Sequence, residues 1–372
     1  MIFTHADIFR PDGCFRPGSF AVENGRFTRV WDEECPAADV DLEGSCVIPG
    51  VIDVHSHGNS GFDFSDGEGL ETMMRYYAAH GVTAVTPASM TLGEETLAHA
   101  YREARRFAGD DHPGCARLAG IYMEGPFFSS KKRGAQNPDF LREPDYAMVK
   151  RLDEAAGGLL KIICVAPELP GAMEFIRQAA EKYTVSIAHT ETDYDTARSA
   201  VEQGATELTH LFNAMPGIHH RNAGPIGAGS EDERVYAELI CDGMHVSPSA
   251  VRMAFRLFPS RVCIISDSLS CCGLPDGQYK SGGMDVFLKD GLCRLADGTI
   301  AGSVCSAYDG MRNCVRFGIP REEAILSATL RPARQIGRAG ELGSIEPGKL
   351  ADFVVCGEDL SRRAVYIGGE KV

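Results

Sequence analysis

The chain has 372 residues, of which 44% are hydrophobic and 24% charged, with 41 glycines spread along its length. This composition excludes disordered and fibrous classes, and the length suits a barrel-sized domain with a smaller second domain. The formal net charge of -15 argues against a nucleic-acid partner, because phosphate backbones are bound by clustered Lys and Arg.

The two ends of the chain are similar in style. Residues 1–48 contain short strand patterns with turns such as PDG and ENG, and residues 343–372 repeat this arrangement in GSIEPGKLADFVVCGEDL and AVYIGGEKV. Chain termini often lie close together in space. We therefore predict a small β-sandwich domain built from residues 1–50 plus 343–372.

The region between the ends, residues 51–342, has the pattern of a catalytic barrel. Short apolar runs alternate with helical patterns, as in βα units wound on a parallel sheet. Eight runs are present, the number that closes a barrel: VIDVHSH (51–57), TAVTPAS (83–89), RLAGIYMEG (117–125), LKIICVA (160–166), TVSIAHT (184–190), TELTHL (206–211), YAELICDG (236–243) and RVCIISD (261–267). We predict an α/β fold, a (β/α)8 barrel of the TIM type.

Helical patterns fill most of the gaps between these runs, and a glycine follows several of them as a stop. Examples are GLETMMRYYAAHG, EETLAHAYREARRF, AMEFIRQAAEKY and YDTARSAVEQG. Residues 213–233 are rich in Gly, His and Pro without a helical period, so we expect a long loop over the barrel mouth. After the eighth strand, residues 285–299 predict a β-hairpin and residues 306–317 a helix.

The thirteen cysteines and the N-terminus bear on the compartment. The odd number and the lack of CxxC-type pairing favour reduced, mostly buried thiols. We interpret the neighbours Cys271 and Cys272 as structural, because adjacent cysteines rarely reach one ion together. The opening residues MIFTHADIFR lack a basic stretch followed by an apolar run, and no segment approaches the roughly 20 apolar residues of a membrane helix. We predict a cytoplasmic protein with no membrane partner.

Polar side chains that can bind a metal stand at the ends of the predicted strands. His55 and His57 are two residues apart on the first strand, so both leave the same face. In a barrel, groups that end different strands converge on the C-terminal rim, and four more such groups are Glu124 (third strand), His189 (fifth), His210 (sixth) and Asp267 (eighth). Any one of them could merely cap its strand, but six together indicate a functional site.

The donor types restrict the metal. Imidazole nitrogens with carboxylate oxygens favour zinc or iron over calcium or magnesium, and we expect Zn²⁺ or Fe²⁺. Glu124, His189 and His210 make a three-ligand site with a position left for water. His55 and His57 can hold a second ion nearby, with Glu124 or water as the bridge. The sequence is compatible with one ion or two.

Several segments, in this order, carry a resemblance to a known family: IPGVIDVHSHG, GVTAVTPAS, MEGPFFSSKKRGAQNP, THLFNAMPG, CDGMHV, ISDSLSCCGLPDGQY, GTIAGS and ATLRPARQIG. Over nearly the whole chain they resemble the N-acetylglucosamine-6-phosphate deacetylases of the amidohydrolase superfamily. EGPF followed by KRGAQ, and HLFNAM followed by an Arg-containing loop, are specific to that branch. The resemblance implies hydrolysis of the N-acetyl group of N-acetyl-D-glucosamine 6-phosphate to glucosamine 6-phosphate and acetate, a step of amino-sugar catabolism.

The resemblance also implies roles for the site residues. Asp267 corresponds to the catalytic aspartate, and Glu124, His189 and His210 correspond to the primary metal ligands. The metal would acidify water and polarise the amide carbonyl, while Asp267 would take the proton from that water and pass it to the departing nitrogen. His245 would donate a hydrogen bond to the carbonyl or a sugar hydroxyl, and a solvated loop histidine is the alternative interpretation.

For the substrate, the resemblance points to Ala135, Gln136, Asn213, Ala214, Arg221, His245, Ile300, Ala301 and Gly302. Asn213 with the following amide suits phosphate oxygens, and Arg221 adds a planar charged fork. In similar enzymes the equivalent arginine comes from the neighbouring subunit, which implies a homodimer. The basic residues 131–133 are a further candidate for attracting the anion, with a solvated loop as the plainer interpretation.

The chain differs from the usual sequence of the family at Met123, Ala188 and Ser268, and in the loop HHRNAGP around Arg221. None of these changes removes a ligand. The loop, however, leaves the sugar open: the epimer N-acetylgalactosamine 6-phosphate would meet the same metal and acid–base groups.

Two other functions are alternatives. A cyclic amidase or deaminase of the same superfamily would commonly use a carbamylated lysine at the end of the fourth strand, where this chain has Cys164, Val165 and Ala166. A barrel that only binds or scaffolds should have lost ligands or the acid–base group, and all of them are present.

Overall fold

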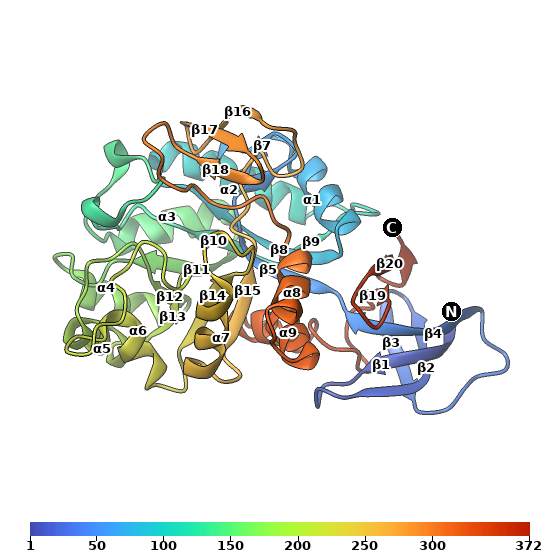
Figure 1. The fold of residues 1–372 in the computed structure, drawn as a ribbon. Coiled ribbons are helices and arrows are strands. Elements are labelled where there is room, and N and C mark those ends of the chain that lie inside the picture. The colour runs from blue at the N-terminus through green and yellow to red at the C-terminus, as the bar shows by residue number, and fades with distance from the viewer.

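A computed structural model describes all residues, 1–372. Eight parallel strands form a barrel, in the order β5 (Val51–Ser56), β8 (Val82–Ser89), β10 (Ile121–Met123), β11 (Leu160–Val165), β12 (Thr184–Ile187), β13 (Ala205–Leu208), β14 (Tyr236–Ile240) and β15 (Val262–Ile265). Backbone hydrogen bonds join the last strand to the first, from Asp267 N to His55 O (2.9 Å) and from His57 N to Ser268 O (2.8 Å). The predicted barrel is confirmed (Figure 1).

The third predicted strand is interrupted. Residues 117–125 form two short strands, β9 (Arg117–Leu118), which pairs with β8, and β10, which continues the barrel. At the break, a Cβ on Gly120 would lie only 2.3 Å from the side chain of Lys161. A glycine is therefore needed at position 120, where this segment approaches the strand that contains Lys161.

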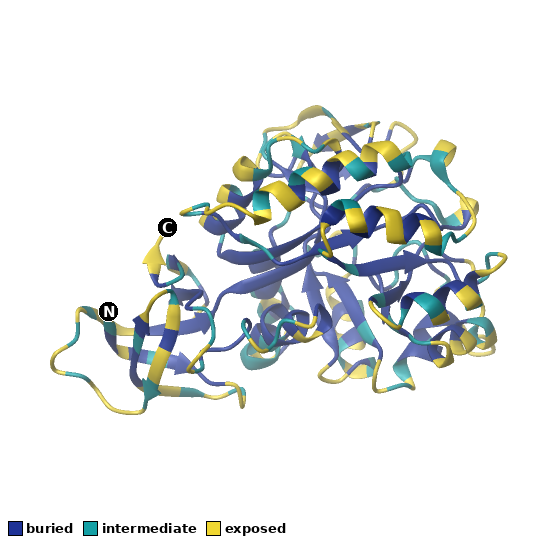
Figure 2. Cartoon of the chain, turned by 180° about the vertical axis from the view of Figure 1, so that it is seen from behind, coloured by how far each residue is buried: buried dark blue, intermediate teal, exposed yellow.

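Helices cover the outside of the barrel, with their exposed faces outward and the strands buried beneath them (Figure 2). They are α1 (Leu70–Ala79), α2 (Glu94–Ala108), α3 (Tyr146–Ala156), α4 (Ala172–Ala179), α5 (Tyr194–Glu202), α6 (Gly224–Ser230), α7 (Pro248–Leu257), α8 (Ala307–Arg316), α9 (Arg321–Ala328) and α10 (Leu330–Gln335). Side-chain caps fix several starts: Asp145 accepts from two amides of α3, and Ser306 from one of α8. The predicted helix at 306–317 is thus present.

The prediction of an irregular loop over residues 213–233 was wrong in its second part, because Gly224–Ser230 form α6. Pro225 stands in the first turn, where its missing N–H needs no partner. The helix is built from small residues that pack closely, and a Cβ on Gly227 would lie 3.5 Å from the ring of Tyr194 on α5. Because glycines occupy several of its positions, the sequence of this helix shows no helical period of apolar residues.

The predicted hairpin over 285–299 is part of a three-stranded antiparallel sheet. Its strands are β16 (Gly277–Ser281), β17 (Met284–Lys289) and β18 (Leu292–Arg294). The hairpin strands end at Arg294, and residues beyond it turn back so that Ala301 N donates to Cys293 O (3.0 Å). In Figure 1 this sheet lies at the top of the barrel, and the terminal strands lie at the lower right.

Both chain ends enter one seven-stranded sheet beside the barrel (Figure 1). It contains β1 (Ile2–Phe9), β2 (Phe15–Glu23), β3 (Arg26–Trp31), β4 (Val40–Pro49), β19 (Phe353–Cys356), β20 (Arg362–Ile367) and β21 (Glu370–Lys371). The sheet folds over on itself: Phe27 N donates to Lys349 O (2.9 Å), and Phe3 packs against Phe353 and Tyr366 in its interior. We propose that residues 1–50 plus 343–372 form this domain and residues 51–342 the catalytic one.

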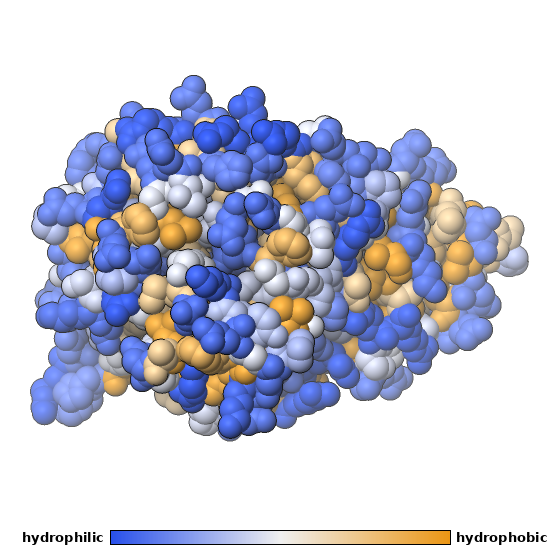
Figure 3. Space-filling model, turned by 90° about the horizontal axis from the view of Figure 1, so that it is seen from above, coloured by the Kyte–Doolittle hydropathy of each residue, from blue (hydrophilic) through white to orange (hydrophobic).

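No helix has both the length and the apolar character that a bilayer crossing requires. The face shown in Figure 3 is mostly hydrophilic, with its apolar side chains in small separate groups.

Candidate active site

The six metal-binding side chains predicted at the strand ends meet at one end of the barrel. They form two sets of potential ligands, in each of which the donor atoms lie within 4.8 Å of one another. One set is His55, His57 and Asp267; the other is Glu124, His189 and His210. All six residues are buried.

The second set is centred on a single carboxylate oxygen. Glu124 Oε1 lies 3.1 Å from His189 Nε2 and 3.1 Å from His210 Nε2. The other oxygen, Oε2, accepts a hydrogen bond from the amide of Gln136 and lies 3.3 Å from His57 Nε2. Glu124 therefore contacts both sets.

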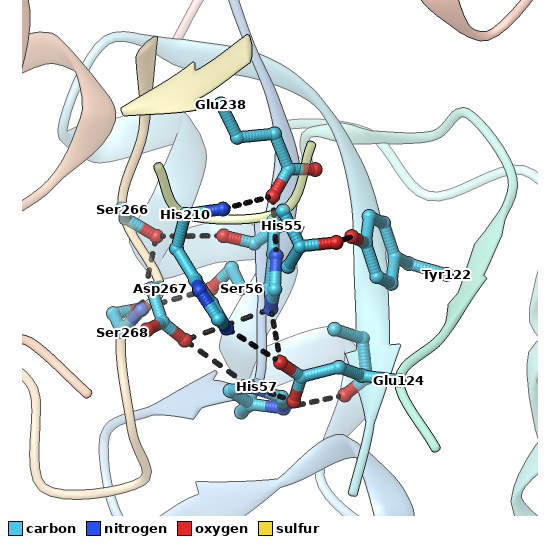
Figure 4. A network of polar contacts seen from close by, with 12 residues as sticks. His55, Ser56, His57, Tyr122, Glu124, His210, Glu238, Ser266, Asp267 and Ser268 are labelled. Atoms are coloured by element: carbon cyan, nitrogen blue, oxygen red, sulfur yellow. Dashed lines mark hydrogen bonds and ion pairs between the residues drawn. The ribbon is translucent and has the colours of Figure 1, made fainter. Parts of the chain in front are cut away.

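The first set faces Glu124 across the centre of the barrel mouth (Figure 4). Asp267 Oδ1 lies 3.2 Å from His57 Nε2 and 3.6 Å from His55 Nε2. His55 Nε2 is also 3.6 Å from Glu124 Oε1, and it is buried without a hydrogen-bond partner. A buried nitrogen that has no hydrogen-bond partner and lies beside two carboxylates is a candidate ligand for a metal ion.

Hydrogen bonds on the far side of three rings orient their Nε2 atoms inward. The Nδ1 atoms of His57 and His189 lie 3.1 and 2.9 Å from the carbonyl oxygens of Ala88 and Lys132. His55 Nδ1 lies 2.9 Å from a Glu238 oxygen. A carbonyl oxygen can only accept, so the Nδ1 atoms of His57 and His189 carry protons and their Nε2 atoms are left to bind a cation.

Three of the site residues adopt a backbone conformation that L-residues rarely take. His189, His210 and Asp267 have φ values of 44°, 31° and 48°. They follow directly after β12, β13 and β15, where the chain turns and aims these side chains into the mouth. Such strain costs about 1–3 kcal/mol at each position and is typical of functional sites.

The electrostatics of the cluster favour charge despite burial. Burial opposes ionisation of Glu124, but the surrounding histidines hold its pKa well below the usual range. Burial likewise opposes the charge of His210, yet the hydrogen bond to Glu124 raises its pKa to about 9. Ionised acids beside histidines form a set in which a divalent cation can replace protons.

A cavity of about 310 Å³ opens above these groups. Of the predicted site residues, twelve line it: His57, Glu124, Ala135, Gln136, His189, His210, Asn213, Ala214, His245, Asp267, Ile300 and Gly302. The remaining lining residues include Lys131 and Lys132 of the basic run, together with Met90, Leu269 and Thr299. The cavity is large enough for a small ligand.

Three predicted residues lie outside the cavity wall. His55 is immediately beneath it, among the ligand atoms. Ala301 is buried behind Ile300 and Gly302. Arg221 is exposed on the loop that precedes α6, and its side chain does not reach the cavity of its own chain.

His245 is held in the cavity wall by a neighbouring acid. Its Nδ1 lies 2.7 Å from Asp242 Oδ2, and its backbone N donates to Asp242 Oδ1 (2.9 Å). Burial opposes the charge of Asp242, but the contact with His245 holds its pKa below the usual range. The Nδ1 proton is fixed in this way, and Nε2 is left for the cavity.

Two contacts of the site were not predicted from the sequence. Gln136 was expected only to bind substrate, but its side chain donates to Glu124 and accepts from Thr91 N (2.7 Å). Glu238 was not singled out, although a charged residue at an inward-facing strand position, in YAELICDG, is a signal that could have identified it.

Comparisons with known proteins identify the family of the chain. The model of the amidohydrolase family matches residues 46–372. The chain is 34% identical over 356 residues to an N-acetylglucosamine-6-phosphate deacetylase of Vibrio furnissii (94% of this chain, 89% of that protein) and 34% identical over 342 residues to an N-acetylgalactosamine-6-phosphate deacetylase of Escherichia coli O157:H7 (91% and 90%). The crystal structure of N-acetyl-D-glucosamine-6-phosphate deacetylase from Mycobacterium smegmatis is similar with a TM-score of 0.93 and 33% identity, covering 100% of each chain.

Proposed function

The chain belongs to the amidohydrolase family, and we propose that it is a metal-dependent deacetylase that converts N-acetylglucosamine 6-phosphate and water to glucosamine 6-phosphate and acetate. One observation carries the proposal. Two sets of imidazole and carboxylate donors converge on one cavity, in a chain whose relatives with this activity match it over nearly its whole length.

The donor set fits a divalent transition metal. Zn²⁺ or Fe²⁺ suits these nitrogens and oxygens; Glu124, His189 and His210 would hold one ion, and His55 and His57 a second. When bound, such an ion acidifies water and polarises the acetamido carbonyl. The inward Nε2 atoms and the unpartnered His55 nitrogen support this assignment.

Asp267 and His245 would carry the proton transfers and the carbonyl contact. Asp267 lines the cavity with a carboxylate that His57 keeps ionised, although burial opposes its charge. It accepts a proton from the attacking water and returns it to the sugar nitrogen, because an amine leaves only when protonated. His245, with Nδ1–H held by Asp242, directs Nε2 into the cavity, where the ring donates to the carbonyl when both nitrogens are protonated and accepts from a sugar hydroxyl when it is neutral.

The phosphate would bind at the rim of the same cavity. Asn213 and Ala214 line it from the loop after β13, and Lys132 adds a cation to the same lining. Arg221 would come from a second copy of the chain, since it is exposed and does not reach its own cavity. We propose a homodimer on this ground, and the large apolar side chains of Ile218 and Met244, 46% and 52% exposed, suit such an interface.

A direct assay tests the function. Metal-stripped protein is reloaded with Zn²⁺ or Fe²⁺, and acetate release is measured with N-acetylglucosamine 6-phosphate, its galacto epimer and unphosphorylated N-acetylglucosamine. We expect cleavage of the phosphorylated gluco sugar and a loss of about 10²–10⁴-fold in kcat for Asp267→Asn. Metal-loaded protein that cleaves neither phosphorylated sugar would overturn the proposal.

The galacto epimer is the second candidate, because one close relative is named for it. The bound galacto epimer would have the same acetamido group next to Asp267 and would differ from the gluco sugar at one ring hydroxyl. The gluco sugar is favoured since several relatives and solved structures that match nearly the whole chain are named for it. The faster epimer in the assay decides between them.

Other activities of the superfamily are less well supported. The fourth strand ends without a lysine, and Cys164 there is in contact with Tyr122 and Thr209 inside the barrel. A cytoplasmic location remains our proposal, because a phosphorylated sugar is a metabolite retained inside cells.

A further inference from the structure

Glu238 is a carboxylate in the interior of the barrel. Its strand, β14, alternates: Ala237 and Leu239 pack outward against the helices, while Ile240 belongs to the inner cluster. Glu238 therefore points inward, and no part of it is exposed to solvent. A charge at this depth is costly unless specific partners compensate it, so its partners indicate its role.

The partners of Glu238 are two histidines of the proposed metal site. Glu238 Oε2 lies 2.9 Å from His55 Nδ1 and accepts a hydrogen bond from the backbone N of His210 (3.1 Å). One oxygen thus joins two residues that stand on different strands and belong to different ligand sets. In Figure 4 Glu238 lies behind both histidines, on the side away from Glu124 and Asp267.

We propose that Glu238 is a positioning residue that holds His55 as the tautomer protonated at Nδ1 and fixes the turn that carries His210. Because the same oxygen accepts from the backbone N of His210, we assign it as the acceptor of the His55 Nδ1 proton as well, which leaves the lone pair of His55 at Nε2. That atom lies 3.6 Å from both Glu124 Oε1 and Asp267 Oδ1 and has no partner in the protein. A carboxylate behind a metal-binding histidine orients the ring and increases its basicity.

A buried carboxyl away from the site supplies the control. Asp153 of α3 is also buried, and its side chain is bonded by Lys182 and Tyr183. None of its hydrogen-bond partners belongs to the proposed site. Asp153→Asn therefore changes a buried carboxyl without touching Glu238 or the ligands.

The test measures metal binding and rests on the proposed metal site. Zn²⁺ is titrated into metal-free protein against a competing chelator, for the wild type, Glu238→Met, Glu238→Gln and Asp153→Asn, with melting temperatures recorded in parallel. We expect Glu238→Met to lower Zn²⁺ affinity about 10–100-fold. Glu238→Gln, which keeps an acceptor oxygen, should recover most of the loss, and Asp153→Asn should bind like the wild type.

The outcomes are separable. If the wild type binds no Zn²⁺, the proposed metal function fails. If it binds and Glu238→Met is unchanged, or Asp153→Asn loses as much affinity, the positioning role is overturned. A second measurement does not depend on how the variants fold: long-range ¹H–¹⁵N NMR of the metal-free wild type should show His55 as the Nδ1–H tautomer, and an Nε2–H tautomer would contradict the proposal.

Discussion

His189 and His210 approach each other with their Nε2 atoms 3.1 Å apart, each also 3.1 Å from the same oxygen of Glu124. Two imidazole nitrogens and a carboxylate at this spacing need a shared proton or a cation between them. The proposed ion therefore stabilises the folded state as well as serving catalysis, because ligands assembled by folding bind it only in that state.

Metal removal should accordingly lower the melting temperature. At a free metal concentration about 100 times its Kd, bound metal contributes about 2.7 kcal/mol. We expect EDTA to destabilise the wild type and to have a smaller effect on His210→Ala, which keeps only the proposed second site at His55 and His57. His99→Ala, on the exposed face of α2, is the control and should respond as the wild type does. An EDTA effect of the same size in His210→Ala would contradict this prediction.

His245→Asn should reduce kcat more than it changes KM. With Nδ1–H held by Asp242, Nε2 can donate to the carbonyl only when the ring carries both protons. The variant removes this donor, and loss of one such donor typically costs about 10²–10³-fold in kcat. Asp242→Asn keeps an acceptor for the His245 Nδ1 proton and should cost much less. Steady-state kinetics with matched circular dichroism spectra check both variants, and a normal kcat in His245→Asn would place the carbonyl contact elsewhere.

Much of this site could be predicted from the sequence, because most of its residues occupy the same kind of position, the end of a barrel strand. A parallel barrel brings every strand end to one rim, so residues as distant as His55 and Asp267 could be expected to meet. The same rule located Glu124, His189 and His210. Each stands one to two residues beyond its strand, within the error of a pattern-based boundary.

Other features depend on contacts that no local pattern encodes. Gln136 reaches Glu124 because the loop after β10 folds back over the site. Glu238 sits inside a strand, and its sequence context does not identify the histidine it faces. The helix α6 could not be predicted, because its glycines leave no helical period of apolar residues in the sequence. The position of Arg221 relative to a substrate depends on a second chain, which the sequence of one chain does not place.

Subunit complementation should restore activity lost through Arg221. If Arg221 serves the partner's cavity, Arg221→Ala and Asp267→Asn are each inactive alone. In a mixed dimer, the subunit with Asp267 intact receives Arg221 from the other. Random co-assembly should therefore recover about a quarter of wild-type activity. Mixed dimers isolated with two affinity tags that remain inactive would show that Arg221 does not act across the interface.

The contact between Arg117 and Asp352 joins the two domains and should contribute to the free energy of unfolding. Arg117 of β9 donates twice to Asp352, at 2.6 and 2.9 Å, and Asp352 is buried just before β19. Arg117→Ala leaves that carboxylate without its cation and should lower the free energy of unfolding by about 2–3 kcal/mol, with kcat unchanged. Arg16→Ala breaks an exposed pair with Asp12 and should cost about 0.5 kcal/mol or less. Equal losses in urea unfolding would argue against the domain contact.

Glu207 should make the protein less stable as the pH rises. Burial, then the nearby Glu238 carboxylate, raises the pKa of Glu207 well above its usual value in the folded state, whereas in the unfolded chain it ionises near its ordinary pKa of about 4.3. Above that pH the folded state binds more protons than the unfolded state. The contribution of Glu207 to stability is therefore complete below the unfolded pKa and is lost as the pH increases toward the folded one.

Glu207→Gln isolates this effect, since its amide replaces the protonated carboxyl and does not titrate. The variant should exceed the wild type in free energy of unfolding at pH 8 by at least about 1 kcal/mol, and the difference should shrink toward pH 4. Urea unfolding at pH 4, 6 and 8 measures it, with the exposed Glu231→Gln as control. A pH-independent difference would mean that Glu207 is ionised in the fold, and its bond from Gln335 would then be the contact that stabilises a buried charge.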